Sequence, residues 1–208
     1  NDLMSLGMHR LWKKRFVEIM SIKENEIILD VGSGSGDIAS EILKEKLPTS
    51  LYLLDLNEEM LSEGKKRLEK EKNIKYFIGN AEKLEFESNF FDKYVISFCL
   101  RNVTEYLLSL KEAYRVLKPG GKYCCLEFST PKSSLISSSY KIYKSKILPL
   151  LGQIVAKDRN AYEYLSESID LFPSQEELSK NLRDCGFTKV ETINLFNGIV
   201  AIHTGYKI

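Results

Sequence analysis

The chain lacks the features that mark several common classes of protein. Only four of its 208 residues are cysteine, and none has the C-x-x-C spacing of a redox or metal site. They lie in apolar stretches, which indicates small buried side chains rather than disulfides or metal ligands: Cys99, Cys124, Cys125 and Cys185. There is no secretory signal and no apolar run near the roughly 18 residues that a spanning helix needs. The sequence therefore predicts a cytoplasmic, non-spanning protein without a metal.

Net charge is also nearly absent. Thirty basic residues face 29 acidic ones, so no overall field favours nucleic acid, and we expect no nucleic-acid partner. One region departs from this balance, because residues 131–159 hold six basic side chains and one acidic, a local charge of +5. With 43% apolar residues, a chain of this length predicts one compact domain over residues 1–208.

What is present begins with a strand, a glycine loop and a helix. The branched apolar run at 27–31 contains Asp30 and is followed by alternating glycines, Gly32, Gly34 and Gly36. This pattern predicts a buried parallel strand, a loop whose amides approach a ligand, and a helix over 38–43.

A second strand is predicted at 51–54, and it ends in Asp55. A carboxylate there can accept both ribose hydroxyls of an adenosine. The alternative is that Asp55 caps the helix that follows.

The alternation of strands and helices continues through the chain. We predict helices at 8–21, 104–117 and 175–185, strands at 74–78, 91–98 and 122–128, and a hairpin of 188–194 with 199–206. Ser174 and Glu177 have the spacing of a capping box. The predicted fold class is α/β: a Rossmann-like, doubly wound, mostly parallel seven-stranded sheet with an antiparallel C-terminal hairpin.

The spacing of the glycines distinguishes between adenosine cofactors. The dinucleotide fingerprint G-x-G-x-x-G would place its third glycine at Asp37. The order Asp30-x-Gly32-x-Gly34-x-Gly36 instead resembles the first motif of class I S-adenosylmethionine methyltransferases. No second mononucleotide-binding half follows, so we interpret the cofactor as S-adenosylmethionine.

Further segments resemble one family along the whole chain, the ubiquinone/menaquinone biosynthesis C-methyltransferases. The matching segments are residues 1–5, 9–13, 79–82, 100–104, 114–121, 126–129, 164–169 and 198–207. The resemblance implies methyl transfer to a ring carbon of a polyprenylated benzoquinol, of the 2-methoxy-6-polyprenyl-1,4-benzoquinol type, or of demethylmenaquinol. It further implies a cytoplasmic enzyme that is peripheral at the inner membrane, as a homodimer or within a quinone-biosynthesis complex.

The same resemblance implies a set of site residues. Besides the loop residues, cofactor contacts are implied for Ser35, Asp55, Asn80, Ala81 and Ser97. Asn80 has an alternative role as the cap of the following turn. Asp30 would either bond the loop amides or approach the methionine amino group.

Arg101 and Asn102 are the predicted catalytic residues, just beyond the fourth strand. A guanidinium can stabilise the phenolate oxygen that makes a quinol carbon nucleophilic, and Asn102 can orient a water. The alternative for Arg101 is a salt bridge to Glu105.

The basic stretch at 131–159, within an insertion at about 131–165, has three interpretations: a solvated helical pair, a lid over the prenyl tail or a patch on anionic lipid. Two other functions stay open. One is another small-molecule class I methyltransferase, such as a catechol O-methyltransferase; the other is a non-catalytic module that keeps the cofactor fold.

Overall fold

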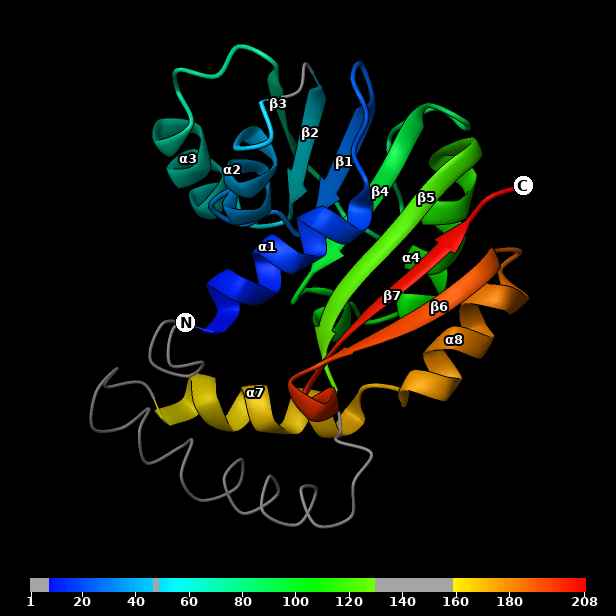
Figure 1. Cartoon of the computed structure of the whole chain (residues 1–208). Helices are drawn as coiled ribbons and strands as arrows, with labels where there is room; N and C mark the ends of the chain where they lie inside the picture. The colour runs from blue at the N-terminus through cyan, green and yellow to red at the C-terminus, as the bar shows by residue number, and fades with distance from the viewer. Residues whose placement is uncertain (1–7, 47–48, 130–158) are drawn as a thin grey trace.

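The computed structural model describes residues 8–46, 49–129 and 159–208 as a sheet with helices on both faces (Figure 1). The strands are β1 (Ile27–Val31), β2 (Ser50–Asp55), β3 (Ile74–Ile78), β4 (Phe91–Ser97), β5 (Leu117–Phe128), β6 (Thr188–Leu195) and β7 (Val200–Tyr206). The helices are α1 (Met8–Met20), α2 (Asp37–Leu43), α3 (Glu58–Arg67), α4 (Tyr106–Val116), α7 (Arg159–Leu171) and α8 (Gln175–Asp184), with 3₁₀ turns η1 (Leu100–Asn102) and η4 (Phe196–Gly198).

The sheet order is β3-β2-β1-β4-β5-β7-β6, with β7 antiparallel to both of its neighbours. The chain moves outward from β1 to β3 and then returns to β4 on the other side of β1. That reversal puts the topological switch point between β1 and β4, where a ligand is expected beyond the carboxyl ends of the strands. The predicted fold class is confirmed.

Two apolar layers cover the sheet. One packs α1, α2 and α3 against it through side chains such as Phe16, Ile38 and Leu61. The other packs α4 and α8 through side chains such as Leu110 and Leu178. Because side chains alternate along a strand, Asp30 lies on the same face as Ile28, the face covered by α1, α2 and α3.

Local sequence signals explain the element ends. Ser174 accepts a hydrogen bond from the amide of Glu177 at 3.2 Å and caps α8, as predicted. Strand β5 begins at Leu117, before the strand predicted at 122–128, and its first part contains a bulge. Phe91 pairs with Leu117 and Lys93 with Lys122, so residues 118–121 face Asp92 alone.

The predicted basic segment at 131–159 lies outside the described residues, apart from Arg159, which begins α7. In Figure 1, α7 crosses beneath the carboxyl ends of the parallel strands. Within the described ranges, no helix is both long enough and apolar enough to cross a membrane.

Candidate functional site

A cavity of about 460 Å³ opens at the switch point, beyond the carboxyl ends of β1, β2 and β4. Its walls come from the glycine loop, the segment after β2, the segment after β3 and the turn after β4. The lining residues are Val31, Gly32, Gly34, Leu54, Asp55, Leu56, Asn57, Met60, Gly79, Asn80, Ala81, Glu82, Phe98, Cys99, Asn102, Val103 and Thr104. Within this set two side chains are acidic and none is basic.

The glycine loop uses its own amides to hold its shape. The N–H groups of Gly32 and Ser33 both donate to the carbonyl of Leu54, at 2.8 and 3.1 Å, and that of Gly36 donates to Ser33. The amide of Gly34 donates to Asp55 Oδ2 at 2.7 Å. These four donors are therefore already engaged, unlike the free amides of a loop that cradles a pyrophosphate.

Asp55 is the residue that ties the loop to β2. Its Oδ2 holds Gly34, and its Oδ1 accepts from the amide of Asn57 at 2.9 Å. The alternative prediction that Asp55 caps α3 is wrong, because Asn57 is the cap and its side chain accepts from the amide of Met60. A carboxylate has about four acceptor positions, so Asp55 retains capacity for ribose hydroxyls.

Two glycines of the loop are required by packing. Gly32 has φ of 64°, and a Cβ there would lie 2.1 Å from Cys99 Sγ. Gly36 has φ of 77°, and a Cβ there would lie 2.8 Å from Leu68 Cδ1. The close contact of Gly32 with Cys99 brings the loop after β1 against the turn after β4. Burial, then the charges of Glu127 and Asp55, raises the pKa of the Cys99 thiol to about 12, so this wall is an uncharged sulfur.

Asp30 is buried behind the loop, with 2% of its surface exposed. Among the described residues neither carboxylate oxygen has a hydrogen-bond partner. Burial, followed by the charges of Asp55 and Asp37, raises the pKa of Asp30 to about 8, and Lys13 acts in the opposite direction. The predicted alternative that Asp30 bonds the loop amides is wrong, since Leu54, Ser33 and Asp55 accept them. An orphaned buried carboxylate beside a cavity is suited to a ligand ammonium.

Asn80 and Ala81 form the wall that follows β3. Asn80 Oδ1 accepts from the amide of Glu82 at 2.9 Å, so the alternative role as a cap is confirmed. The same residue lines the cavity, which leaves its NH₂ group as the part suited to a ligand. Ala81 is buried and supplies an apolar surface.

The predicted catalytic residues lie in η1, just after β4. Arg101 Nη1 donates to Glu127 Oε1 at 2.8 Å and to the carbonyl of Phe98 at 2.6 Å. The alternative prediction of a salt bridge to Glu105 named the wrong partner, since the acceptor is Glu127 on β5. Asn102 lines the cavity and accepts at 3.4 Å from the hydroxyl of Tyr164 on α7.

The structure thus gathers six of the predicted site residues on the cavity wall: Gly32, Gly34, Asp55, Asn80, Ala81 and Asn102. The other five lie behind it or beside it: Asp30, Ser35, Gly36, Ser97 and Arg101. Sequence reasoning missed Met60, Phe98 and Cys99. Phe98 and Cys99 directly follow β4, so the rule that ligands lie beyond strand ends could have found them. Met60 lies in the first turn of α3, and its Cε would be 3.4 Å from a Cβ on Gly34.

This strand order, together with a glycine loop tied to the acid that ends β2, defines a class I methyltransferase. Solved structures show the same fold. A methyltransferase from Aquifex aeolicus described as SAM-dependent has a TM-score of 0.70 at 19% identity, covering 96% of this chain and 93% of that one. Phosphoethanolamine N-methyltransferase 2 of Haemonchus contortus, in complex with S-adenosyl-L-methionine, has a TM-score of 0.71 at 20% identity, covering 94% and 52%.

The chain belongs to the ubiE/COQ5 methyltransferase family, whose family model matches residues 1–207. Its curated relatives include proteins named ubiquinone/menaquinone biosynthesis C-methyltransferase UbiE. Those of Rickettsia prowazekii and Rickettsia bellii are each 50% identical over 216 residues, covering all of this chain and 86% of the relative. The family predicted from the sequence is confirmed.

Proposed function

We propose that this chain is an S-adenosylmethionine-dependent C-methyltransferase of ubiquinone/menaquinone biosynthesis. The observation that best supports the cofactor is the charge of the cavity, which is lined by Asp55 and Glu82 and, among its described walls, by no basic residue. S-adenosylmethionine brings a sulfonium and an ammonium, whereas a nicotinamide dinucleotide brings two phosphates. The amides of the loop also favour S-adenosylmethionine, because those that already donate within the protein are not available to a pyrophosphate.

Different residues of the chain bind different parts of the cofactor. S-adenosylmethionine supplies a methyl group that its sulfonium has already activated. Asp55 accepts the ribose hydroxyls, while the Asn80 amide and Ala81 meet the adenine. Asp30 receives the ammonium, which gives its two oxygens the partner that they lack. Gly32 and Cys99 narrow the cavity between loop and turn, so that the ligand is held in one orientation.

The acceptor is the ring carbon of a polyprenylated quinol, of the 2-methoxy-6-polyprenyl-1,4-benzoquinol type or demethylmenaquinol. Such a carbon becomes nucleophilic when a neighbouring hydroxyl gives its proton to a water, and after the methyl transfer the same ring carbon loses its hydrogen as a proton to water. Asn102 faces the cavity and orients that oxygen or a water beside it. Arg101 is the neighbour of Asn102 in the chain, and its ion pair with Glu127 fixes its position. Its positive charge favours the phenolate.

A prenylated substrate comes from a lipid phase, which supports a cytoplasmic enzyme that visits the inner membrane as a peripheral protein. The composition of residues 131–159 supports the same interpretation, although that segment lies outside the described residues. Assembly as a homodimer or within a quinone-biosynthesis complex stays a prediction.

The test begins with calorimetry of S-adenosylmethionine and of NAD on the purified protein. We expect S-adenosylmethionine to bind, and Asp55→Ala to weaken it by about 1.5–3 kcal/mol through loss of charged hydrogen bonds. Glu58→Gln, on the exposed side of α3, is the matched control and should bind normally. Binding of NAD in place of S-adenosylmethionine would contradict the cofactor assignment.

The second step is mass spectrometry of the product from each quinol. A mass gain of one methyl on a ring carbon supports the proposal. Tight cofactor binding with no transfer to either quinol would instead favour the non-catalytic module. In cells that lack the protein, the quinol intermediate that accumulates identifies the physiological acceptor.

A further inference from the structure

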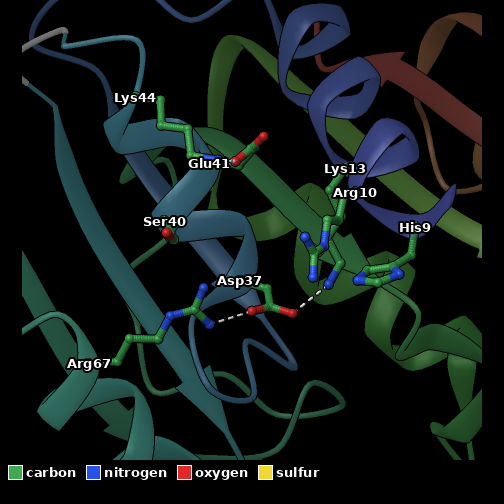
Figure 2. Close-up of a pocket in the computed structure, with 8 residues that line it drawn as sticks. All are labelled: His9, Arg10, Lys13, Asp37, Ser40, Glu41, Lys44 and Arg67. Carbon is green, nitrogen blue, oxygen red and sulfur yellow. Dashed lines mark hydrogen bonds and ion pairs between the residues drawn. The ribbon is translucent and has the colours of Figure 1, made fainter. Parts of the chain in front are cut away.

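A second cavity, also of about 460 Å³, lies between α1, α2 and the end of α3 (Figure 2). It begins at Asp37, directly after the glycine loop, and shares no lining residue with the cofactor cavity. All eight lining side chains are polar or charged: His9, Arg10, Lys13, Asp37, Ser40, Glu41, Lys44 and Arg67. A cavity of this composition is not suited to an apolar ligand.

Asp37 organises the centre of this cavity. Lys13 of α1 and Arg67 of α3 both form ion pairs with it, one on each carboxylate oxygen. Figure 2 shows Arg67 approaching Asp37 from one side and Lys13 from the other, with Arg10 beside Lys13. Burial alone would raise the pKa of Asp37, but the hydrogen bonds from Lys13 and Arg67 outweigh it and lower this pKa to about 2.

The two cations keep donors beyond those that Asp37 uses. Lys13 Nζ has three N–H groups and Arg67 has five, and each bonds Asp37 through one nitrogen. Lys13 has 13% of its side chain exposed and Arg67 has 47%, so one donor lies at the floor and the other at the rim. Because a shared carboxylate already fixes both side chains, little conformational entropy is lost when they meet an anion.

The ion pairs of the wall also favour an anion. Lys44 pairs with Glu41, whereas Lys13 and Arg67 share the single carboxylate of Asp37, so this central group carries one positive charge more than it has negative ones. The cofactor cavity, by contrast, has two acidic side chains and no basic one within its described walls. The two cavities at this end of the sheet therefore select ligands of opposite charge.

We propose that the cavity between α1, α2 and α3 binds a phosphate group, either as free phosphate or as the headgroup of an anionic phospholipid. A planar guanidinium with a lysine ammonium is the donor set that phosphate recognition commonly uses. Ser40 adds a hydroxyl from α2. The inference does not depend on the acceptor proposed above, since it concerns a different cavity.

Calorimetry with inorganic phosphate tests the site directly. We expect saturable binding to the parent protein and about tenfold weaker binding to Arg67→Gln, for loss of a charged hydrogen bond. Lys66→Gln removes the same charge from the neighbouring exposed position of α3 without touching the cavity, and it should bind as the parent does. Ser40→Asp adds a negative charge to the wall and should abolish binding. Equal affinities of the parent protein and Arg67→Gln would overturn the proposal.

Vesicles distinguish the two sources of phosphate. If the ligand is a headgroup, vesicles of phosphatidylcholine with phosphatidylglycerol bind the parent protein better than they bind Arg67→Gln or Ser40→Asp, and Lys66→Gln binds as the parent does. Binding of inorganic phosphate without this discrimination assigns the site to the free ion.

S-adenosylhomocysteine affinity is measured on the same variants and should not change. If Arg67→Gln weakens that affinity as much as it weakens phosphate, the cavity belongs to the cofactor site and the proposal is wrong. A failure of S-adenosylhomocysteine to bind any variant, the parent included, would count against the proposed function and not against this site.

Discussion

Asp30 and Glu127 are equally buried carboxylates, yet their surroundings differ. Each has 2% of its surface exposed, Asp30 near the carboxyl end of β1 and Glu127 near that of β5. Glu127 accepts from the guanidinium and the amide of Arg101, and from the amide of Phe128. Among the described residues Asp30 accepts from none.

This difference separates a carboxylate that holds the fold together from one that is suited to a ligand. Burial raises the pKa of Glu127 although Arg101 and two amides oppose that shift. For Asp30, burial and the negative charges of Asp55 and Asp37 act in the same direction, and they raise its pKa to about 8. A buried carboxyl group without a hydrogen-bond partner lowers stability, and burial of its charged form raises its pKa, so Asp30 is suited to the ligand ammonium proposed above.

The largest expected effect comes from removing the partner of Glu127. Arg101→Ala leaves that carboxylate buried without its cation, and the free energy of unfolding should fall by about 3–5 kcal/mol in urea titrations. Arg101→Ala combined with Glu127→Gln should recover much of this loss, because no unpaired charge remains. If Arg101→Ala keeps its stability and loses turnover, Arg101 acts on the phenolate and is not needed for folding.

The next effect concerns Gly32, which packs on Cys99 and so brings the loop after β1 against the turn after β4. Gly32→Ala places a Cβ 2.1 Å from Cys99 Sγ at φ of 64°, and we expect a loss of about 2–4 kcal/mol in unfolding free energy. Gly120→Ala is the matched control. Gly120 also has positive φ, 84°, but a Cβ there meets nothing within 4 Å, so only the backbone cost of about 1–2 kcal/mol remains. Equal losses would show that crowding at Cys99 is relieved by local movement.

A smaller effect tests the ligand side of the comparison. Asp30→Asn should weaken S-adenosylhomocysteine by about 1.5–3 kcal/mol in calorimetry, because an amide replaces a charged acceptor for the ammonium. The folded protein should not lose stability, since Asn is nearly isosteric and removes an unpaired carboxylate. Unchanged affinity together with lower stability would make Asp30 a structural residue like Glu127.

Much of this architecture follows from sequence patterns that have a local physical cause. The glycine loop, the acid that ends the second strand and the capping box at Ser174 are each marked by a short pattern of neighbouring residues, and their places were predictable. The hydrogen bond from Gly34 to Asp55, 21 positions away, is visible only in the structure. The start of β5 was not, because the pairing of Leu117 with Phe91 is a tertiary contact that overrides the turn signal of Pro119 and Gly120.

Partners distant in the chain were also beyond the reach of sequence patterns. Helical spacing suggested Glu105 for Arg101, but the acceptor is Glu127, 26 positions away on a neighbouring strand. Likewise, the cavity around Asp37 depends on the packing of α1 and α3 against α2, and no sequence motif predicts that packing. Fold class is therefore readable from periodicity, whereas pairing of charges requires the packed structure.

The effect that is smallest for a change of one pH unit is the pH dependence that Asp30 gives to folding. Its pKa is about 8 in the folded protein and near 3.8 in the unfolded chain, so the folded state binds the additional proton between these values. Stability should therefore be highest at the acidic end of this range and fall as pH rises toward about 8, by at most about 1.4 kcal/mol per pH unit from this group. Asp30→Asn should remove that slope in urea titrations from pH 5 to about 8, while Glu58→Gln should keep it. Parallel slopes in the parent protein and Asp30→Asn would mean that Asp30 is already ionised in the folded state, and the contrast with Glu127 would then be one of hydrogen bonding alone.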